Sequence, residues 1–213
     1  MQNRLLAIFD TLLDSFGQRH WWPGETQLEI IVGAVLTQNT SWNNVERAIA
    51  NLKSADAMNL EILHAMDTKE LAELIRPSGF FNIKSRRLKN IIRFIHDSSS
   101  PNLVNLQSMS TDVLRSALLE INGIGKETAD SIVLYAFNKP IFVVDAYTKR
   151  FIQSHRLYSG ANNYDSVQSF FMRNLPLDIY LFNEFHALIV RLCQTYCRKT
   201  ALCDRCPLRE DLS

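Results

Sequence analysis

The chain has almost no excess of charge, and most of its length lacks cysteine. Its 213 residues carry a formal net charge of +1, so no overall basic field attracts a polyanion. A nucleic-acid partner would have to be held by a local patch and by backbone amides. No apolar run reaches the length of a membrane span, and the N-terminus lacks the basic-then-apolar pattern of a signal peptide. We therefore expect a cytoplasmic protein with no membrane partner.

All cysteines are confined to one short stretch near the C-terminus. They are Cys193, Cys197, Cys203 and Cys206, in the spacing C-x3-C-x5-C-x2-C. In a reducing compartment such clustering favours a metal site over disulfides. Four thiolates in one loop can hold a [4Fe–4S] cluster or a zinc ion. The five histidines, by contrast, are scattered and show no ligand spacing with one another, and His186 is expected to be a core residue.

Apolar residues recur at helical spacing along nearly the whole chain. This spacing predicts helices over residues 5–16, 28–36, 83–95, 165–175 and 179–192. Asp67 and Glu70 form a capping box that predicts a helix through Ile75. Only Ile141 to Val144 could form a strand, and this segment is too short to build a sheet. The sequence therefore predicts an all-α fold.

The stretch from Ile121 to Asp145 is the most informative. An apolar helical segment ends at Ile121, a turn with Gly123 and Gly125 follows, and a second helix starts at once. The glycines let the backbone bend tightly and turn several N–H groups outward at a helix N-terminus, which holds a phosphate without reading any base. Asp145 then supplies a carboxylate that could do chemistry beside the anchored strand. This combination suggests a DNA base-excision enzyme.

Three features together resemble the helix-hairpin-helix DNA glycosylases related to endonuclease III. They are the glycine hairpin, Asp145 directly after Val143-Val144, and the terminal cysteines. The resemblance runs almost from one end of the chain to the other. Within the family, Trp21-Trp22-Pro23, Leu36 to Trp42 and Arg76 to Phe80 look most like the bacterial 3-methyladenine DNA glycosylase III branch.

The resemblance implies two all-helical lobes. Residues 24–140 would form a six-helix lobe with the helix-hairpin-helix, and residues 1–23 plus 141–213 a second helical lobe with the cysteine cluster. The implied partner is double-stranded DNA with a damaged base, whose nucleotide is flipped out of the stack. We expect the protein to act as a monomer.

The resemblance makes Asp145 the catalytic residue. Breaking an N-glycosidic bond builds positive charge on the sugar, and a carboxylate can stabilise that charge or activate water. The alternative is that Asp145 caps the helix beginning at Ala146, and one residue can do both. Glu127 departs from the family, because members that also cut the strand carry a lysine there that forms a Schiff base. The neighbouring Lys126 should point elsewhere, since one residue turns a helix by about 100°.

Four residues of the hairpin are expected to grip a phosphate downstream of the lesion: Gly123, Ile124, Gly125 and Lys126. An ordinary helix–helix turn is the alternative, since glycine is common in such turns. Gln38 matches the family residue that fills the gap left by the flipped nucleotide. The alternative for Gln38 is a buried polar residue bonded to a helix end.

Trp21, Trp22 and Trp42 are candidates for the base pocket. In the related 3-methyladenine enzymes, aromatic residues at matching positions sandwich the base. Electron-rich rings attract the positive charge of an alkylated purine by stacking and cation–π contact. The alternative is that these tryptophans pack the interface between the two expected lobes. The densest basic cluster could contact phosphates or could simply be solvated; it consists of Lys84, Arg86, Arg87 and Lys89.

The family implies that the cysteine loop holds a [4Fe–4S] cluster that takes no part in bond breaking. The usual family spacing is C-x6-C-x2-C-x5-C, and this chain departs from it. Cys197, Cys203 and Cys206 approximate its first three positions with one residue deleted. Cys193, one helical turn before Cys197, would supply the fourth ligand. A zinc ion or an empty loop is the alternative.

The residues and the family resemblance together predict a monofunctional DNA glycosylase of base excision repair that releases an alkylpurine, 3-methyladenine above all. One alternative keeps the fold and excises oxidised or mismatched bases with AP lyase activity. Another is a non-catalytic protein that binds DNA structures through the same hairpin. The low net charge argues mildly against this last alternative, because non-specific affinity comes mostly from phosphate neutralisation.

Overall fold

The computed structural model describes residues 1–98, 103–198 and 200–212, and over these ranges it contains helices, turns and no β-strand. The all-α prediction is confirmed. Ile141 to Val144 is buried, yet it forms no strand. Over the same ranges, no helix is both long enough and apolar enough to cross a membrane.

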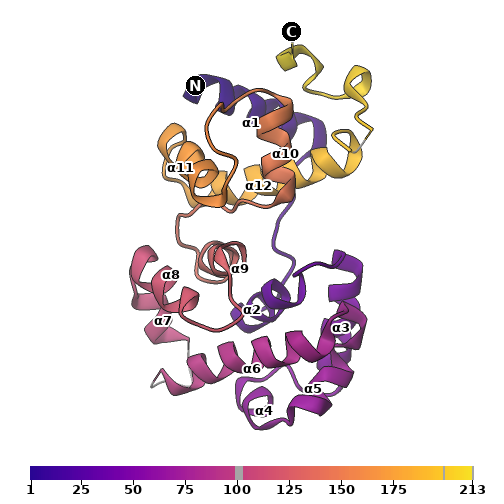
Figure 1. Cartoon of the computed structure of the whole chain (residues 1–213), viewed down its shortest axis with the longest axis vertical. Coiled ribbons are helices and arrows are strands. Elements are labelled where there is room, and N and C mark those ends of the chain that lie inside the picture. Colours follow the sequence, from indigo (N-terminus) through magenta and orange to yellow (C-terminus); the bar gives the residue numbers. More distant parts are fainter. Residues whose placement is uncertain (99–102, 199, 213) are drawn as a thin grey trace. The chain divides into compact units, whose positions relative to one another are not determined.

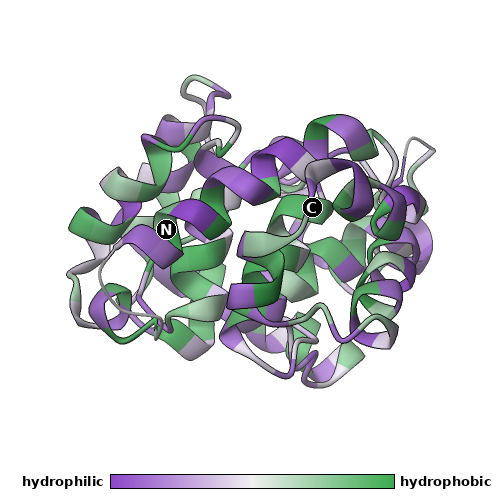
Figure 2. Cartoon of the chain, turned by 90° about the horizontal axis from the view of Figure 1, so that it is seen from below, coloured by the Kyte–Doolittle hydropathy of each residue, from purple (hydrophilic) through white to green (hydrophobic). Residues whose placement is uncertain are grey.

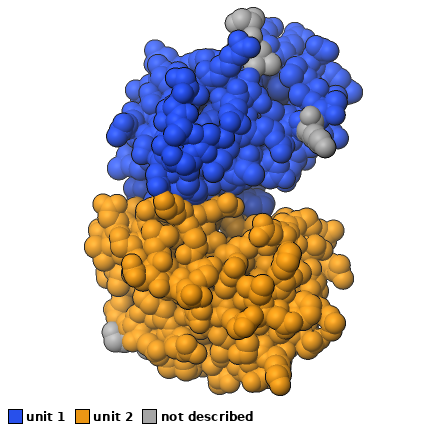
Figure 3. All heavy atoms as spheres, viewed as in Figure 1, with its two compact units in different colours: residues 1–21, 140–213 blue, residues 22–139 orange. Residues whose placement is uncertain are grey.

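The chain divides into two compact units, drawn in different colours in Figure 3. Unit 1 comprises Met1–Trp21 and Pro140–Ser213, and unit 2 comprises Trp22–Lys139. Unit 1 contains α1 (Gln2–Phe16), α10 (Ala146–Ser154), α11 (Tyr164–Asn174), α12 (Ile179–Thr195) and the short 3-10 segments η3 (Cys203–Arg205) and η4 (Arg209–Leu212) (Figure 1). Unit 2 contains α2 (Gln27–Leu36), α3 (Trp42–Ser54), α4 (Leu60–Ala65), α5 (Thr68–Leu74), η1 (Arg76–Ser78), α6 (Phe81–Asp97), α7 (Val104–Ser108), α8 (Thr111–Leu119), α9 (Lys126–Ser131) and the π-helical η2 (Ile132–Ala136).

Unit 2 is built around α2. The Thr26 side chain caps this helix by accepting a hydrogen bond from the Glu29 backbone N–H at 3.1 Å. From Ile31 to Leu36 every residue is buried, so α2 has no solvent stripe. The helix contacts α3, α6, α9 and η2, which together surround it. This packing fixes the C-terminal end of α2, where the segment around Gln38 begins.

The long helix α6 is amphipathic, and Figure 2 shows such divided hydrophobic and hydrophilic faces on several helices. Two of its lysines do not point to solvent. Lys84 is buried and its ammonium donates to the carbonyls of Leu36 and Ser78 at 2.8 and 2.7 Å. Lys89 donates to three carbonyls at the end of α4. Both lysines therefore donate to carbonyls that helix ends leave without donors. Two of the four residues of the predicted basic cluster thus bond to the protein's own backbone.

The core of unit 1 is rich in phenylalanine. Phe142 stacks on Phe171 with ring centroids 4.0 Å apart, and Phe9 meets Phe185 edge-on at 5.6 Å. The end of the chain is fastened to this core through Asp211. Its carboxylate lies 2.8 Å from Arg4 Nε and 2.7 Å from His155 Nδ1. Ion pairs thus hold the segment that follows the cysteines.

Candidate active site

The predicted hairpin is present in unit 2 and is braced from inside. It consists of α8, a turn and α9, and an ion pair joins its helices: Arg115, which is half-buried, places Nε 2.6 Å from Oδ1 of the buried Asp130. Gly123 in the turn has a φ of 93°, a conformation that residues with a Cβ rarely adopt. A Cβ at Gly123 would also lie 2.3 Å from Arg87 Cγ. Glycine is therefore required here by the protein itself.

Gly125 is different, because nothing in the protein crowds it. It is the N-cap of α9, with φ −93° and ψ 176°, and a Cβ there would meet no atom within 4 Å. Because Gly125 has no side chain, it cannot accept a capping hydrogen bond from the first backbone amides of α9. A helix N-terminus open in this way suits an anion. Lys126 and Glu127 are exposed in the first turn beside it.

Gln38 connects three parts of unit 2. Its amide nitrogen donates to Thr128 Oγ1 at 2.9 Å and to the Gly123 carbonyl at 3.3 Å. Its amide oxygen accepts a short hydrogen bond from Arg87 of α6. The residue is half-buried and its side chain bonds to the hairpin. Gln38 thus holds the hairpin turn against α6. One of its partners, Thr128, lies in the first turn of α9, as the alternative of a polar residue bonded to a helix end predicts.

An aromatic cluster forms in unit 2 around Trp22. Its ring meets Trp42 edge-on with centroids 5.1 Å apart, and Tyr135 of η2 at 5.3 Å. The indole also lies over Gly33, where a Cβ would approach Trp22 Nε1 to 3.1 Å. Trp42 donates to Glu46 Oε1 at 2.9 Å, and Trp21 is the last residue of the first segment of unit 1. The structure therefore brings Trp22 and Trp42 together.

Asp145 caps α10, which confirms the capping role considered from the sequence. Its Oδ1 accepts from the Thr148 backbone N–H at 2.7 Å and from the Thr148 hydroxyl at 2.9 Å. Its Oδ2 lies 3.6 Å from His186 Nε2. Burial raises the pKa of Asp145, but His186 and Thr148 together outweigh burial and hold the pKa below its ordinary value. A buried carboxylate that remains ionised is suited to stabilising positive charge.

Three further residues belong to this description, and none of them was assigned to the site from the sequence. His186 is buried, as expected, but it also faces Asp145 from α12. Tyr135 lies in a π-helical segment, and such segments are frequent at functional sites. Phe80 has a positive φ of 45° and is 65% exposed, an unusual state for phenylalanine. Of the three, only Phe80 could have been noticed in the sequence, because it follows Gly79 directly before a helix. In the structure Phe80 is the N-cap of α6 and provides no capping hydrogen bond.

Three of the four cysteines are buried, namely Cys193, Cys197 and Cys206, and Cys203 is exposed. A hydrogen bond from Cys193 lowers the pKa of Cys197 to about 6, and Ser154 and Arg150 act in the same direction. The same bond, together with burial, raises the pKa of Cys193. A thiolate is thus favoured at Cys197, and a thiolate is the form that binds metal.

Comparisons with known proteins agree with this geometry. The family described as HhH-GPD superfamily base excision DNA repair protein matches residues 32–177. A Methanocaldococcus jannaschii protein named "Putative DNA repair glycosylase MJ1434" is 50% identical over 97% of this chain and 94% of its own length. The structure of H. pylori 3-methyladenine DNA glycosylase (MagIII) bound to 1,N6-ethenoadenine is 32% identical, with a TM-score of 0.77 and coverage of 90% of this chain and 95% of that chain. A trapped endonuclease III–DNA covalent intermediate is similar in fold, with a TM-score of 0.83, 18% identity and coverage of 99% and 94%.

The fold and the braced hairpin define the class as DNA repair glycosylases. The chain belongs to the HhH-GPD superfamily of base excision DNA repair proteins, and the resemblance to endonuclease III-like enzymes is confirmed. DNA is the partner of this class.

Proposed function

We propose that this DNA glycosylase hydrolyses the N-glycosidic bond of an alkylated purine, 3-methyladenine above all, and lacks AP lyase activity. The observation that carries the proposal is the aromatic cluster of Trp22, Trp42 and Tyr135. An alkylated purine is cationic, and aromatic faces attract it more strongly than they attract a neutral base. The 32% identity to a 3-methyladenine glycosylase bound to 1,N6-ethenoadenine supports the same base class.

Within the proposed base pocket, Trp42 stacks on the base and Trp22 supports Trp42. This division rests on the packing of Trp22, whose ring is already in contact with Tyr135 and Gly33. Trp22→Ala should therefore reduce both stability and excision. Trp42→Ala should mainly raise KM for the lesion, because it removes a ring that binds the base in its ground state.

Asp145 provides the chemistry in this proposal. The base leaves with the electrons of the bond from C1′ to nitrogen, and the sugar becomes positively charged. The Asp145 carboxylate stabilises this charge, accepts a proton from the attacking water, and the water oxygen bonds to C1′. Oδ2 is the atom we assign to this work, because Oδ1 already accepts two hydrogen bonds from Thr148.

Anchoring of the DNA is assigned to the hairpin. The backbone amides at the start of α9 would bind a phosphate, with Gly123, Ile124, Gly125 and Lys126 forming the turn. Gln38 bonds to Gly123 and so positions this turn. Phe80, which is exposed on unit 2, would wedge between bases when the nucleotide leaves the stack.

The absence of lyase activity is inferred from Glu127, which has no amine to form a Schiff base. Borohydride reduction, which traps such an intermediate as a covalent protein–DNA complex, tests the point. We expect no trapped complex with the wild type. If a complex forms and Lys126→Ala abolishes it, the neighbouring lysine performs the reaction and this part of the proposal is wrong.

We assign the four cysteines to a [4Fe–4S] cluster, which would stabilise the end of unit 1 without taking part in bond breaking. Three of these cysteines are buried, and the lowered pKa of Cys197 favours the thiolate, which is the form that binds metal. Cys193, Cys197, Cys203 and Cys206 are the proposed ligands.

The deciding experiment measures base release from duplexes that each carry one defined lesion, with and without hot alkali afterwards. Release of 3-methyladenine, with strand breaks only after alkali, is the expected result. Release of oxidised or mismatched pyrimidines, with breaks before alkali, would favour an endonuclease III-like lyase. Asp145→Asn should abolish excision while DNA binding is retained; if this variant still excises, Asp145 loses its assigned role. If no lesion is released, a non-catalytic DNA binder remains.

A further inference from the structure

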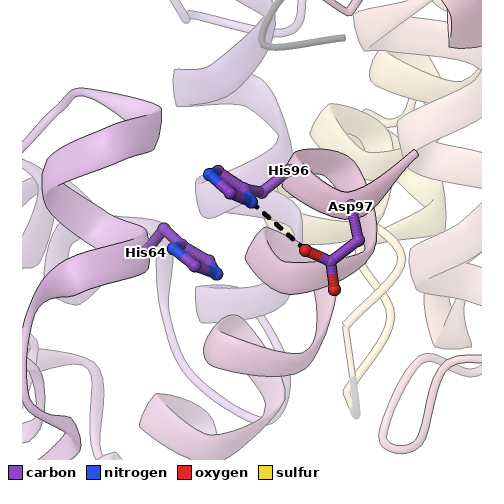
Figure 4. A group of neighbouring side chains, drawn as sticks. All are labelled: His64, His96 and Asp97. Atoms are coloured by element: carbon purple, nitrogen blue, oxygen red, sulfur yellow. Dashed lines mark hydrogen bonds and ion pairs between the residues drawn. The ribbon is translucent and has the colours of Figure 1, made fainter. Parts of the chain in front are cut away.

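Two histidines that are far apart in the sequence lie face to face on unit 2 (Figure 4). The rings of His64 and His96 have centroids 3.7 Å apart and are inclined by only 3°. His96 Nδ1 lies 3.2 Å from Asp97 Oδ1, and His96 Nε2 lies 3.3 Å from Glu61 Oε2. One donor atom from each of His64, His96 and Asp97 can be chosen so that all three lie within 4.8 Å of one another. The histidines show no ligand spacing in the sequence, but the fold brings two of them together.

We propose that His64, His96 and Asp97 form a binding site for a divalent ion of the zinc type, separate from the DNA site and from the cysteine loop. Two imidazoles and one carboxylate are a typical donor set for zinc, and water can take the fourth position. Magnesium and calcium prefer sites made of oxygen alone, so they should not compete. The His96 side chain is 33% exposed, so an ion can reach it from solvent.

Glu61 has a separate part in this site. His96 has a carboxylate on each side, because Nδ1 faces Asp97 and Nε2 faces Glu61. When Nδ1 binds the ion, Nε2 keeps its proton and donates a hydrogen bond to the Glu61 carboxylate. A carboxylate behind a metal-binding histidine orients the ring and makes it a better ligand.

The stacked arrangement itself predicts a change on binding. Two parallel rings cannot direct their in-plane lone pairs at one ion. One ring must turn about χ2, and this torsion has a broad, shallow energy profile in histidine. Zinc binding should therefore break the ring stack, and the ring protons of both histidines should shift in NMR spectra.

The backbone around the site is already held in place. Lys89 of α6 donates to the carbonyls of Leu63, His64 and Met66, which fixes the end of α4 against α6. His64 lies in the last turn of α4 and His96 in the last turn of α6. A cation at the C-terminal ends of two helices is favoured by both helix dipoles. The ion would join α4 to α6 and so stabilise unit 2.

Thermal unfolding and isothermal titration with Zn²⁺, each on the whole protein, test the proposal. The wild type should bind one more equivalent than a His64→Ala variant and should unfold at a higher temperature when zinc is added. His96→Ala should also lose this equivalent, Asp97→Asn should weaken it, and Glu61→Gln should weaken it roughly 10–100-fold. His20→Ala is the matched control, since His20 is an exposed histidine of unit 1 and should bind as the wild type does.

Co²⁺ separates this site from the cysteine loop. Thiolate ligands give intense charge-transfer absorption in the near ultraviolet, whereas imidazole and carboxylate ligands give only weak visible bands. The visible bands should disappear in His64→Ala while any thiolate absorption stays. The proposal is overturned if both histidine variants, shown by circular dichroism to be folded, bind as much Zn²⁺ as the wild type. It is equally overturned if the wild type binds no ion beyond those on the cysteines.

Discussion

Alanine at Gly123 should destabilise the protein and alanine at Gly125 should not, although both glycines belong to the same turn. At Gly123 the φ is 93°, and the new Cβ would lie 2.3 Å from Arg87 Cγ and 2.9 Å from Cδ. At Gly125 the φ is −93°, and the new Cβ would meet no atom within 4 Å. The first glycine is required by the protein, and we expect the second to be required by the DNA.

The magnitudes follow from these contacts. Holding an alanine at the Gly123 backbone angles costs about 1–3 kcal/mol. Displacing Arg87 weakens its hydrogen bond to Gln38, which adds about 1 kcal/mol for a partly exposed pair. A total of about 2–4 kcal/mol lowers the unfolding midpoint by about 6–12 °C, at about 3 °C per kcal/mol for a chain of this size. Gly125→Ala should change the free energy of unfolding by less than about 1 kcal/mol, because alanine restricts the unfolded chain but is a poorer N-cap residue than glycine.

Thermal unfolding measures the first quantity, and fluorescence anisotropy with a labelled duplex at fixed salt measures DNA affinity. Gly123→Ala should lose both stability and affinity. Gly125→Ala should keep its stability and lose affinity, because a methyl group would stand where a phosphate approaches the backbone. The reasoning is refuted if Gly125→Ala destabilises the protein as much as Gly123→Ala, or if it binds DNA as the wild type does.

Other predictions concern titration and the cysteines. His186→Phe should raise the pKa of Asp145, because burial raises this pKa and His186 counteracts burial. The acid limb of the single-turnover pH profile should therefore move to higher pH, and an unmoved limb would contradict this. Burial lowers the pKa of Lys84 to about 8 from 10.5, so the unfolded chain binds more protons between these values and wild-type stability should rise over that pH range. Lys84→Met should lack this rise in urea unfolding and should lose about 2–4 kcal/mol, because two buried carbonyls lose their donor. Cys193→Ser should lower the iron content of anaerobically purified protein as much as Cys206→Ser; full iron in the Cys193 variant would exclude it as a ligand.

Features that depend on residues close together in the chain could be predicted from the sequence. The all-helical fold follows from a spacing that repeats every few residues. The cap at Asp145 involves Thr148, only three positions later, and the cap at Asp67 involves Lys69. The hairpin helices also appear where the glycines predict them. Such features are decided within one or two helical turns, so a single sequence contains the information.

Tertiary structure decided the partners of the polar and aromatic side chains. The sequence shows Lys84 and Lys89 as part of a charged helix face, and only the packing of α6 against α2 and α4 turns them toward backbone carbonyls. The sequence also does not show which aromatic residues contact Trp22, or that His186 lies beside Asp145. The pair of His64 and His96 was missed for the same reason. Each of these contacts joins residues from different helices, and their proximity depends on how whole helices pack, which local spacing does not encode.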